Sequence, residues 1–146
     1  MAKTSPIETL IEIAERETDE AAKLLGNAIR HHEDAIGKLN LLEQYRTDYD
    51  DKLKARAAEG LSISQYANFT AFLNKLDTAV DGQNKLIEDA LHKVEMAKLE
   101  WQKCEKKRLS YQTLDERAKQ VRQKKEAKRD QKQSDEFASR AYFYKS

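Results

Sequence analysis

The three histidines and the one cysteine of this chain are the side chains best suited to bind a transition metal or to act as a nucleophile. His31 and His32 are adjacent, so on a helix they point about 100° apart and cannot hold one ion together. His92 stands alone in a polar stretch. Cys104 lies within an apolar repeat, where a small buried side chain is its ordinary role. We therefore expect no metal ion and no cofactor.

Motifs of enzymatic chemistry are missing from the sequence. It has neither a glycine-rich phosphate-binding loop nor a nucleophile motif, and its His, Cys and Asp residues do not cluster at metal-ligand spacing. This pattern predicts a protein without enzymatic activity. The candidates for function are instead the aromatic side chains and the lysines and arginines, because both kinds of residue bind other macromolecules.

A repeat of apolar residues at alternating steps of three and four runs through the second half of the chain. This spacing indicates a helix that presents one stripe to a partner helix, as in coiled coils. The repeat has one polar member, Gln83. Its positions are Tyr66, Phe69, Leu73, Leu76, Val80, Gln83, Ile87, Ala90, Val94, Ala97, Trp101 and Cys104.

Another helix is predicted from the N-terminal half. Ser5 is placed to cap it, with Pro6 at the first position and Glu8 completing a capping box. The stripe of this helix is rich in alanine, which indicates close approach of the partner helix. We assign Ile7, Ala14, Ala21, Ala28, Ala35, Leu42 and Tyr49 to one position of the stripe, Leu10, Leu24 and Tyr45 to the other, and Ile11, Leu25 and Leu39 to its margin.

Gly60 is the clearest break between the two stretches, because glycine adopts the left-handed conformation that ends a helix, and Ser62 or Ser64 can cap the next one. With 36% charged residues and 1 proline, the composition favours long helices over a compact globule. We predict an all-α fold, a long two-helix antiparallel coiled-coil hairpin. The expected bounds are about 6–58 for helix one, 59–64 for the turn and 65–140 for helix two, within one domain over 1–146.

The C-terminal end of helix two extends past the start of helix one in this hairpin. A turn near residues 60–61 places Ile7 opposite Leu114, so residues beyond about 115 have no partner helix. Such a helical overhang has little apolar surface to bury and is marginal alone. We therefore expect it to bind a partner.

Charge is distributed unevenly between the two ends of the chain. Residues 1–50 carry 6 Lys and Arg against 11 Asp and Glu, a net charge of −5, whereas residues 103–146 carry 14 against 7, a net charge of +7. This asymmetry suits antiparallel helices whose terminal halves lie side by side. The basic segment 117–132 is either a solvated helix or a binding site. Nucleic acid is not the expected partner, because no aromatic residue is interleaved with its cations and the acidic helix neutralises much of the basic surface.

Apolar side chains lie beside the stripe as well as in it. On helix two, Phe72, Ala79 and Leu86 form a row one position away from the core, and the hairpin register brings Tyr49 to Phe72. These residues either thicken the core or form an aromatic face that binds a partner. The sequence leaves both interpretations open.

Several features predict a cytoplasmic protein that does not insert into a membrane. The single cysteine excludes an internal disulfide. No stretch reaches the roughly 18 apolar residues that a membrane-spanning helix requires. The first six residues lack the apolar core of a signal peptide.

Short motifs along the chain match those of one protein family. The most specific are Asp130-Gln131-Lys132, Asp135-Glu136-Phe137-Ala138 and Arg140-Ala141. Further matches are Glu8-Thr9-Leu10, Ala21-Ala22, Leu24-Leu25-Gly26, Leu39, Leu42, Tyr45, Tyr49, Lys93-Val94, Trp101, Gln112-Thr113-Leu114 and Arg117. On these residues the chain resembles the flagellar FliJ family, a small coiled-coil component of the flagellar type III export apparatus, over nearly its whole length.

The resemblance implies a stalk protein that couples an ATPase to an export gate. In this family the paired terminal ends insert into the export ATPase ring, and another surface contacts the cytoplasmic domain of the export gate. The resemblance further implies escort of export chaperones and a location in the cytoplasm, peripherally at the inner membrane beneath the flagellum. The matching residues for the gate are Leu42, Tyr45, Tyr49, Phe72, Leu76 and Ala79. For the ATPase ring we expect Ile7, Leu10, Arg117, Arg122, Phe137 and Arg140.

Two alternatives remain open from the residues themselves. The chain is a structural coiled coil that associates with itself, or a nucleic-acid binder that uses its basic helix. Mass measured at several protein concentrations tests the first alternative, because the stalk that the resemblance implies is expected to be a monomer when free. A salt-titrated binding assay tests the second.

Overall fold

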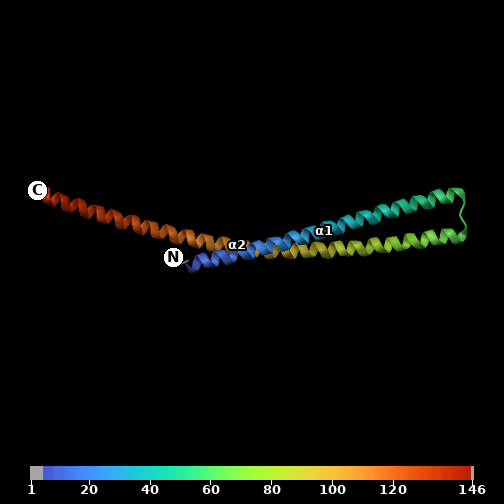
Figure 1. Cartoon of the computed structure of the whole chain (residues 1–146), viewed down its shortest axis with the longest axis horizontal. Helices are drawn as coiled ribbons and strands as arrows, with labels where there is room; N and C mark the ends of the chain where they lie inside the picture. The colour runs from blue at the N-terminus through green and yellow to red at the C-terminus, as the bar shows by residue number, and fades with distance from the viewer. Residues whose placement is uncertain (1–4, 146) are drawn as a thin grey trace. The chain divides into compact units, whose positions relative to one another are not determined.

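The computed structural model describes residues 5–145, which form two long helices, α1 (Pro6–Glu59) and α2 (Ile63–Lys145). The helices pack against each other, and the described residues contain no strand (Figure 1). The predicted all-α fold of two packed helices is therefore confirmed. Neither helix contains, within residues 5–145, a stretch long and apolar enough to cross a lipid bilayer.

Both helices begin with a reciprocal capping box. The backbone N–H of Glu8 donates to Ser5 Oγ at 3.3 Å, and the N–H of Ser5 donates to Glu8 Oε2 at 3.4 Å. At α2 the N–H of Gln65 donates to Ser62 Oγ at 3.1 Å, and the N–H of Ser62 donates to Gln65 Oε1 at 3.2 Å. The predicted cap at Ser5 is confirmed. Because Ser62 rather than Ser64 caps α2, this helix starts earlier than predicted, and it also continues past its predicted end near residue 140.

Gly60 ends α1 in the left-handed conformation, with a φ of 102°. It is the residue at which the sequence predicts the break, and no other described residue has a positive φ. A Cβ placed at Gly60 meets no atom within 4 Å. The requirement for glycine therefore comes from the backbone conformation and not from crowding.

Replacing Gly60 by alanine is expected to lower the free energy of unfolding by about 1 kcal/mol, because a Cβ is disfavoured at this φ. Gly82→Ala is the matched control, since Gly82 lies within α2 and also has open space around its Cβ position. At that helical site alanine should raise the free energy of unfolding by about 1 kcal/mol. Urea unfolding followed by circular dichroism measures both. Effects of the same sign at the two glycines would contradict the conformational account.

Contacts between the helices group the chain into two compact units. One unit joins α1 up to Thr18 with α2 from Lys103 onward, and the other comprises Asp19–Gln102 with the turn. Each unit has its own seam, meaning the row of side chains packed between its two helices. The two seams differ in their chemistry and are described separately.

The unit Asp19–Gln102 has its apolar core near the turn. Leu53, Leu73 and Leu76 are buried and form one cluster. Burial of a leucine side chain stabilises the fold by roughly 1.5–3 kcal/mol, so this cluster anchors the turn end of the helix pair. The partly buried side chains packed against it are Tyr49, Leu61, Phe69 and Phe72.

Farther from the turn, the seam of this unit is narrower. Ala21, Ala35 and Ala90 are buried, and Gln83 crosses the seam between them. The Gln83 side-chain amide donates to the backbone oxygen of Ala35 at 2.9 Å, so this buried polar group is satisfied. The predicted close approach of the helices at alanine positions is in agreement with this packing.

The predicted repeat of α2 is confirmed from Phe69 to Cys104, because each of those positions is buried or half-buried. Its first position is wrong, since Tyr66 is 53% exposed. Residues 54–59 of α1, which the register places beside Tyr66, are exposed as well, so the packed seam of the two helices ends at Leu53 and Phe69.

The predicted stripe of α1 is half correct. The set from Ile7 to Tyr49 at seven-residue spacing is buried or half-buried throughout. The other assigned set is wrong, because Leu10, Leu24 and Tyr45 are 42%, 64% and 54% exposed. The packed row is reached by a step of four from Ile7 to Ile11, whereas the assigned row took a step of three to Leu10. The true second row is Ile11, Thr18, Leu25, His32, Leu39, Arg46 and Leu53.

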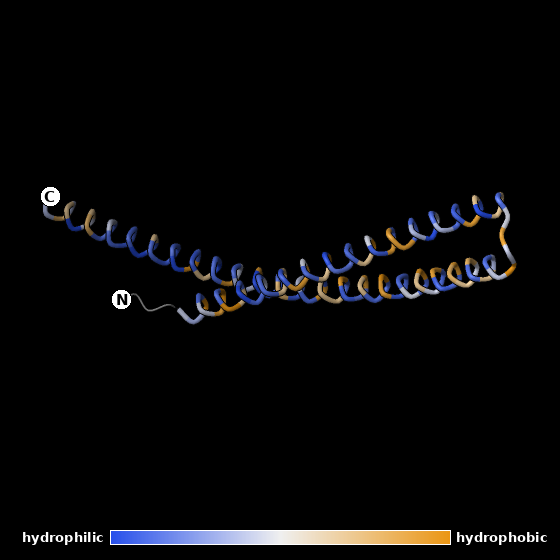
Figure 2. Tube along the Cα trace, turned by 45° about the vertical axis from the view of Figure 1, so that its right-hand side comes forward, coloured by the Kyte–Doolittle hydropathy of each residue, from blue (hydrophilic) through white to orange (hydrophobic). Residues whose placement is uncertain are grey.

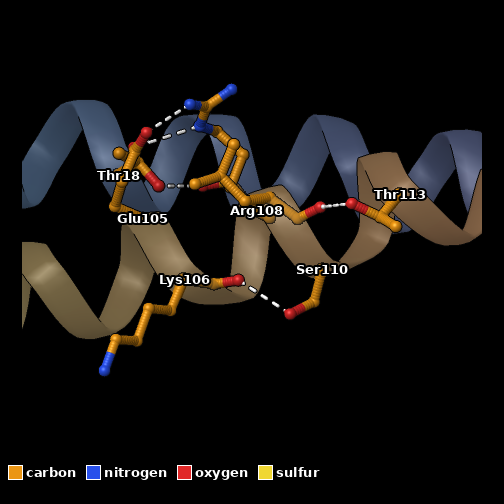
Figure 3. A network of polar contacts seen from close by, with 8 residues as sticks. Thr18, Glu105, Lys106, Arg108, Ser110 and Thr113 are labelled. Carbon is orange, nitrogen blue, oxygen red and sulfur yellow. Dashed lines mark hydrogen bonds and ion pairs between the residues drawn. The ribbon is translucent and has the colours of Figure 1, made fainter.

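In the unit formed by the chain ends, the fully buried residues that the structure describes are small or polar, and larger apolar side chains such as Ile7 and Ile11 are half-buried. Ala14, Thr18 and Asp115 are the buried residues of this unit. The Thr18 hydroxyl donates to the Ala14 backbone oxygen at 2.7 Å (Figure 3). Asp115 accepts an ion pair from Lys119 on the next turn of α2 at 3.2 Å. This end of the helix pair therefore has little apolar burial to stabilise it.

Charged side chains supplement the packing at the chain ends. Lys107 Nζ lies 3.7 Å from Glu17 Oε2, which links α2 to α1. Arg108 and Glu105 form an ion pair within α2, with Arg108 Nε 3.1 Å from Glu105 Oε2 (Figure 3). The Arg108 hydrogen bond lowers the pKa of Glu105 below its ordinary value. The ion pair between Lys107 and Glu17 agrees with the predicted attraction between the acidic and basic ends.

Candidate functional site

The residues considered for metal binding are dispersed over the helices. His31 and His92 are exposed, His32 is half-buried, and Cys104 is half-buried in the seam. Within residues 5–145, no three side chains of His, Cys, Asp or Glu are close enough together to bind a metal ion. The functional surfaces must therefore be sought among the apolar and charged residues.

Aromatic side chains from both helices meet near the turn. The Tyr49 ring lies 4.5 Å from that of Phe72 and 5.1 Å from that of Phe69, measured between centroids. Tyr45 meets Phe72 edge to face, with their centroids 6.2 Å apart. The predicted contact between Tyr49 and Phe72 is confirmed. We call Tyr45, Tyr49, Phe69 and Phe72 the aromatic cluster.

The six residues predicted for gate contact lie in the same unit but differ in exposure. Leu76 is 7% exposed and belongs to the core. Tyr45 and Ala79 are exposed, and the other three are half-buried. The inner edge of this set thickens the core while its outer edge faces solvent, and binding of a partner by that outer edge stays a prediction. The half-buried members are Leu42, Tyr49 and Phe72.

An ion pair that the sequence did not predict joins the two helices beside the aromatic cluster. Arg46 donates to Asp77 through Nε, and Arg46 Nη2 lies 3.4 Å from Asp77 Oδ2. This hydrogen bond lowers the pKa of Asp77 and raises that of Arg46. Arg46 occupies a seam position of α1. A cation within the heptad row could have indicated an ion pair with the other helix.

Asp77→Asn is expected to lower the stability of the helix pair at neutral pH. Because the folded-state pKa of Asp77 lies below its ordinary value of 3.8, the ion pair stabilises the fold above that pH and loses its effect as the pH falls through the folded-state pKa. Urea midpoints of the variant and the unmodified chain should therefore converge on acidification below about pH 4. A difference that persists unchanged at pH 2 would contradict this account. Asp81→Asn, at an exposed site of α2, is the control.

The C-terminal part of α2 has no packing partner in its unit. All side chains of residues 116–145 are exposed, while the backbone stays helical. Figure 1 shows α2 continuing beyond the start of α1, and Figure 2 shows this segment to be largely hydrophilic. We call residues 116–145 the overhang. Its predicted existence from about residue 115 is confirmed.

Cations occupy the positions of the overhang that continue the seam. The overhang carries 10 Lys and Arg against 5 Asp and Glu, a net charge of +5. Alternating steps of three and four beyond Asp115 reach Ala118 and then four basic residues. Another apolar helix is therefore disfavoured on this face, and an acidic one is favoured. These residues are Arg122, Lys125, Arg129 and Lys132.

The residues predicted for the ATPase ring lie at the chain ends. Ile7 is half-buried and Leu10 is 42% exposed. The four from the overhang are all exposed, including Phe137 at 76%. Three further aromatic residues, Tyr142, Phe143 and Tyr144, were not assigned a role but are exposed at its end. The other overhang residues predicted for the ring are Arg117, Arg122 and Arg140.

These features define a protein of two packed helices whose accessible surfaces suit the binding of other proteins. Comparison with known proteins identifies its family. The sequence profile of the flagellar FliJ protein matches residues 3–146. A flagellar FliJ protein of Salmonella typhi is 31% identical over 141 residues, covering 97% of this chain and 96% of the relative. One from Escherichia coli (strain K12) is 30% identical with the same coverage. The chain therefore belongs to the FliJ family, as its motifs predict.

Proposed function

We propose that this FliJ-family chain is a non-enzymatic coupling protein of the flagellar export apparatus. Its chain ends would enter the ring of the export ATPase and favour the assembled, active ring. Its aromatic cluster would contact the cytoplasmic domain of the export gate. Family membership supports this role, and the overhang is the observation that carries it.

The overhang supports insertion into a protein ring. A helix of this length with no side chain buried gains little stability from its own chain, so burial by a partner supplies what is missing. Its cationic seam positions favour an acidic lining. The half-exposed Leu10 and the exposed Phe137 offer apolar contacts in the same unit.

The outer edge of the aromatic cluster supports contact with a second partner. Tyr45 is 54% exposed although its ring is held against Phe72, so little side-chain entropy remains to be lost on binding. Aromatic anchors of this kind dominate the energetics of many protein interfaces. Ala79, which is exposed, leaves room for a partner to approach.

Family resemblance also supports escort of unladen export chaperones and a place at the cytoplasmic side of the inner membrane. No residue of this chain is assigned to the chaperone contact. The proposed working state is a monomer, and neither nucleic acid nor a metal ion takes part in the proposed mechanism.

Ring assembly tests the proposed function. Purified export ATPase subunits, mixed with the full chain, should shift toward hexamers and hydrolyse ATP faster. The reason is linkage, since a protein that binds the ring and not the loose subunit stabilises the ring. Mass photometry measures the hexamer fraction, and phosphate release measures the rate. Equal affinity for subunit and ring, with no change in either readout, would contradict the proposal.

A further inference from the structure

A groove of about 660 Å³ lies between the helices in the unit Asp19–Gln102. Its floor is made by the buried Ala35, Gln83 and Ala90, whose small or hydrogen-bonded side chains leave the space above them open. Leu41 and Leu86 line it and are 72% and 57% exposed. None of the six residues predicted for gate contact lines this groove.

Charged residues border the groove in an ordered way. Asp34 precedes Arg46 by 12 residues on α1, and Asp89 follows Asp77 by 12 residues on α2. Because Arg46 pairs with Asp77 across antiparallel helices, the two aspartates lie at the same level on opposite sides of the groove. Lys38 lies one turn from Asp34 toward the turn of the chain, and Lys93 lies one turn from Asp89 in the other direction. Glu33, next to Asp34, also lines the groove and adds to the acidic middle, so the border alternates basic, acidic and basic.

The two aspartates and the two lysines make no ion pair with any residue in the described range 5–145. Elsewhere the two helices do pair charges across the seam, at Arg46 with Asp77 and at Glu17 with Lys107. The charges around the groove are therefore available to a ligand. Two exposed leucines beside them add an apolar contact, a combination typical of sites that bind an amphipathic helix.

We infer that this groove is a docking site for a single amphipathic α-helix of a partner protein. The helix carries an acidic, a basic and an acidic residue at one-turn intervals, matching Lys93, the aspartate pair and Lys38 in turn. Leucine-sized side chains on the same face fit between Leu41 and Leu86. Helices pack 8–10 Å apart, and the alanine floor permits an approach of that kind. This site is separate from the aromatic cluster and does not depend on the proposed function.

A designed peptide tests the site directly. The probe is an alanine-based helix of 18 residues with Glu, Arg and Glu at i, i+4 and i+8 and Leu at i+7 and i+11, labelled for fluorescence anisotropy. The full chain should bind it in the micromolar to millimolar range. Asp34→Asn with Asp89→Asn should weaken binding about tenfold, and Leu86→Ala should do the same, with circular dichroism unchanged. Asp51→Asn with Asp81→Asn is the matched control at exposed acids outside the groove, and it should leave the affinity unaltered.

Three outcomes would overturn the inference. The first is the absence of peptide binding at about 1 mM, a concentration at which even weak specific sites are half filled. The second is equal binding of a peptide with its Glu and Arg residues exchanged. The third is a mass by light scattering that rises with concentration and falls on Leu86→Ala, which would make a second copy of this chain the occupant.

Discussion

Deleting residues 116–145 is expected to abolish stimulation of the export ATPase, while the helix pair that remains keeps its thermal midpoint within about 2 °C. Every side chain in this segment is exposed, so its removal costs the fold no apolar burial. The deletion does remove the ion pair of Lys119 with Asp115, a contact within α2 of a kind that contributes about 0.3–0.5 kcal/mol, and a shift well beyond 2 °C would exceed that contribution. Phosphate release by the ATPase and a melting curve by circular dichroism give the two readouts.

Charge reversal at two positions tests whether stimulation of the ATPase depends on the cations of the overhang or only on its length. Arg122→Glu with Arg129→Glu should reduce stimulation several-fold, because both cations lie on the seam face of the overhang. Lys85→Glu with Lys98→Glu makes the same change in net charge at exposed positions of α2 outside the overhang, and stimulation should persist. If both pairs act alike, net charge and not the overhang face governs the effect.

Tyr45→Ala with Phe72→Ala is expected to weaken binding to the gate domain about 100-fold and to leave ATPase stimulation intact. The two rings are in edge-to-face contact, and both lie at the solvent side of the core. Loss of two aromatic anchors from an interface costs about 3 kcal/mol, which corresponds to that factor. Titration calorimetry with the purified gate domain measures it.

Leu76→Ala provides the contrast, because Leu76 is 7% exposed within the core cluster. This change should lower the free energy of unfolding by about 2–3 kcal/mol, the range for a buried leucine in a cavity that can partly relax. If Leu76→Ala also weakens binding to the gate domain, the loss of binding should parallel the loss of helicity, because the variant acts by unfolding the helix pair. A double variant of Tyr45 and Phe72 that unfolds as readily as Leu76→Ala would show that the aromatic cluster is only core.

The sequence predicts the seam of α2 well because eleven of its positions, from Phe69 to Cys104, follow the three-four alternation with one polar interruption. On α1 the same rule fails at the second row, where Thr18, His32 and Arg46 replace apolar residues. The row one position earlier offers Leu10, Leu24 and Tyr45 at an acceptable spacing, but these side chains are exposed. Polar residues can occupy such positions because they find hydrogen-bond partners, Thr18 at Ala14 of its own helix and Arg46 at Asp77 of the other helix. A linear pattern does not contain that information.

The candidate sites likewise differ in whether they could be predicted from the sequence. The overhang follows from counting where α1 begins and α2 ends, so it could be predicted from the sequence. The groove could not, because Asp34 and Asp89 are far apart in the chain and reach the same level through the helix register alone. Leu76 is a residue whose family match suggests a surface role, whereas its packing places it in the core. To distinguish a surface residue from a core residue at such a position, the burial of its side chain must be known, and the periodicity of the sequence does not provide it.

Site-specific photocrosslinking to the assembled export ATPase tests the central proposal most directly. A benzophenone side chain is introduced at Arg129 in the overhang and, separately, at Ile63, which is 90% exposed at the start of α2. Insertion of the chain ends predicts crosslinks to the ATPase from position 129 and none from position 63. Crosslinks from position 63 with none from position 129 would contradict it, because the turn end would then face the ring.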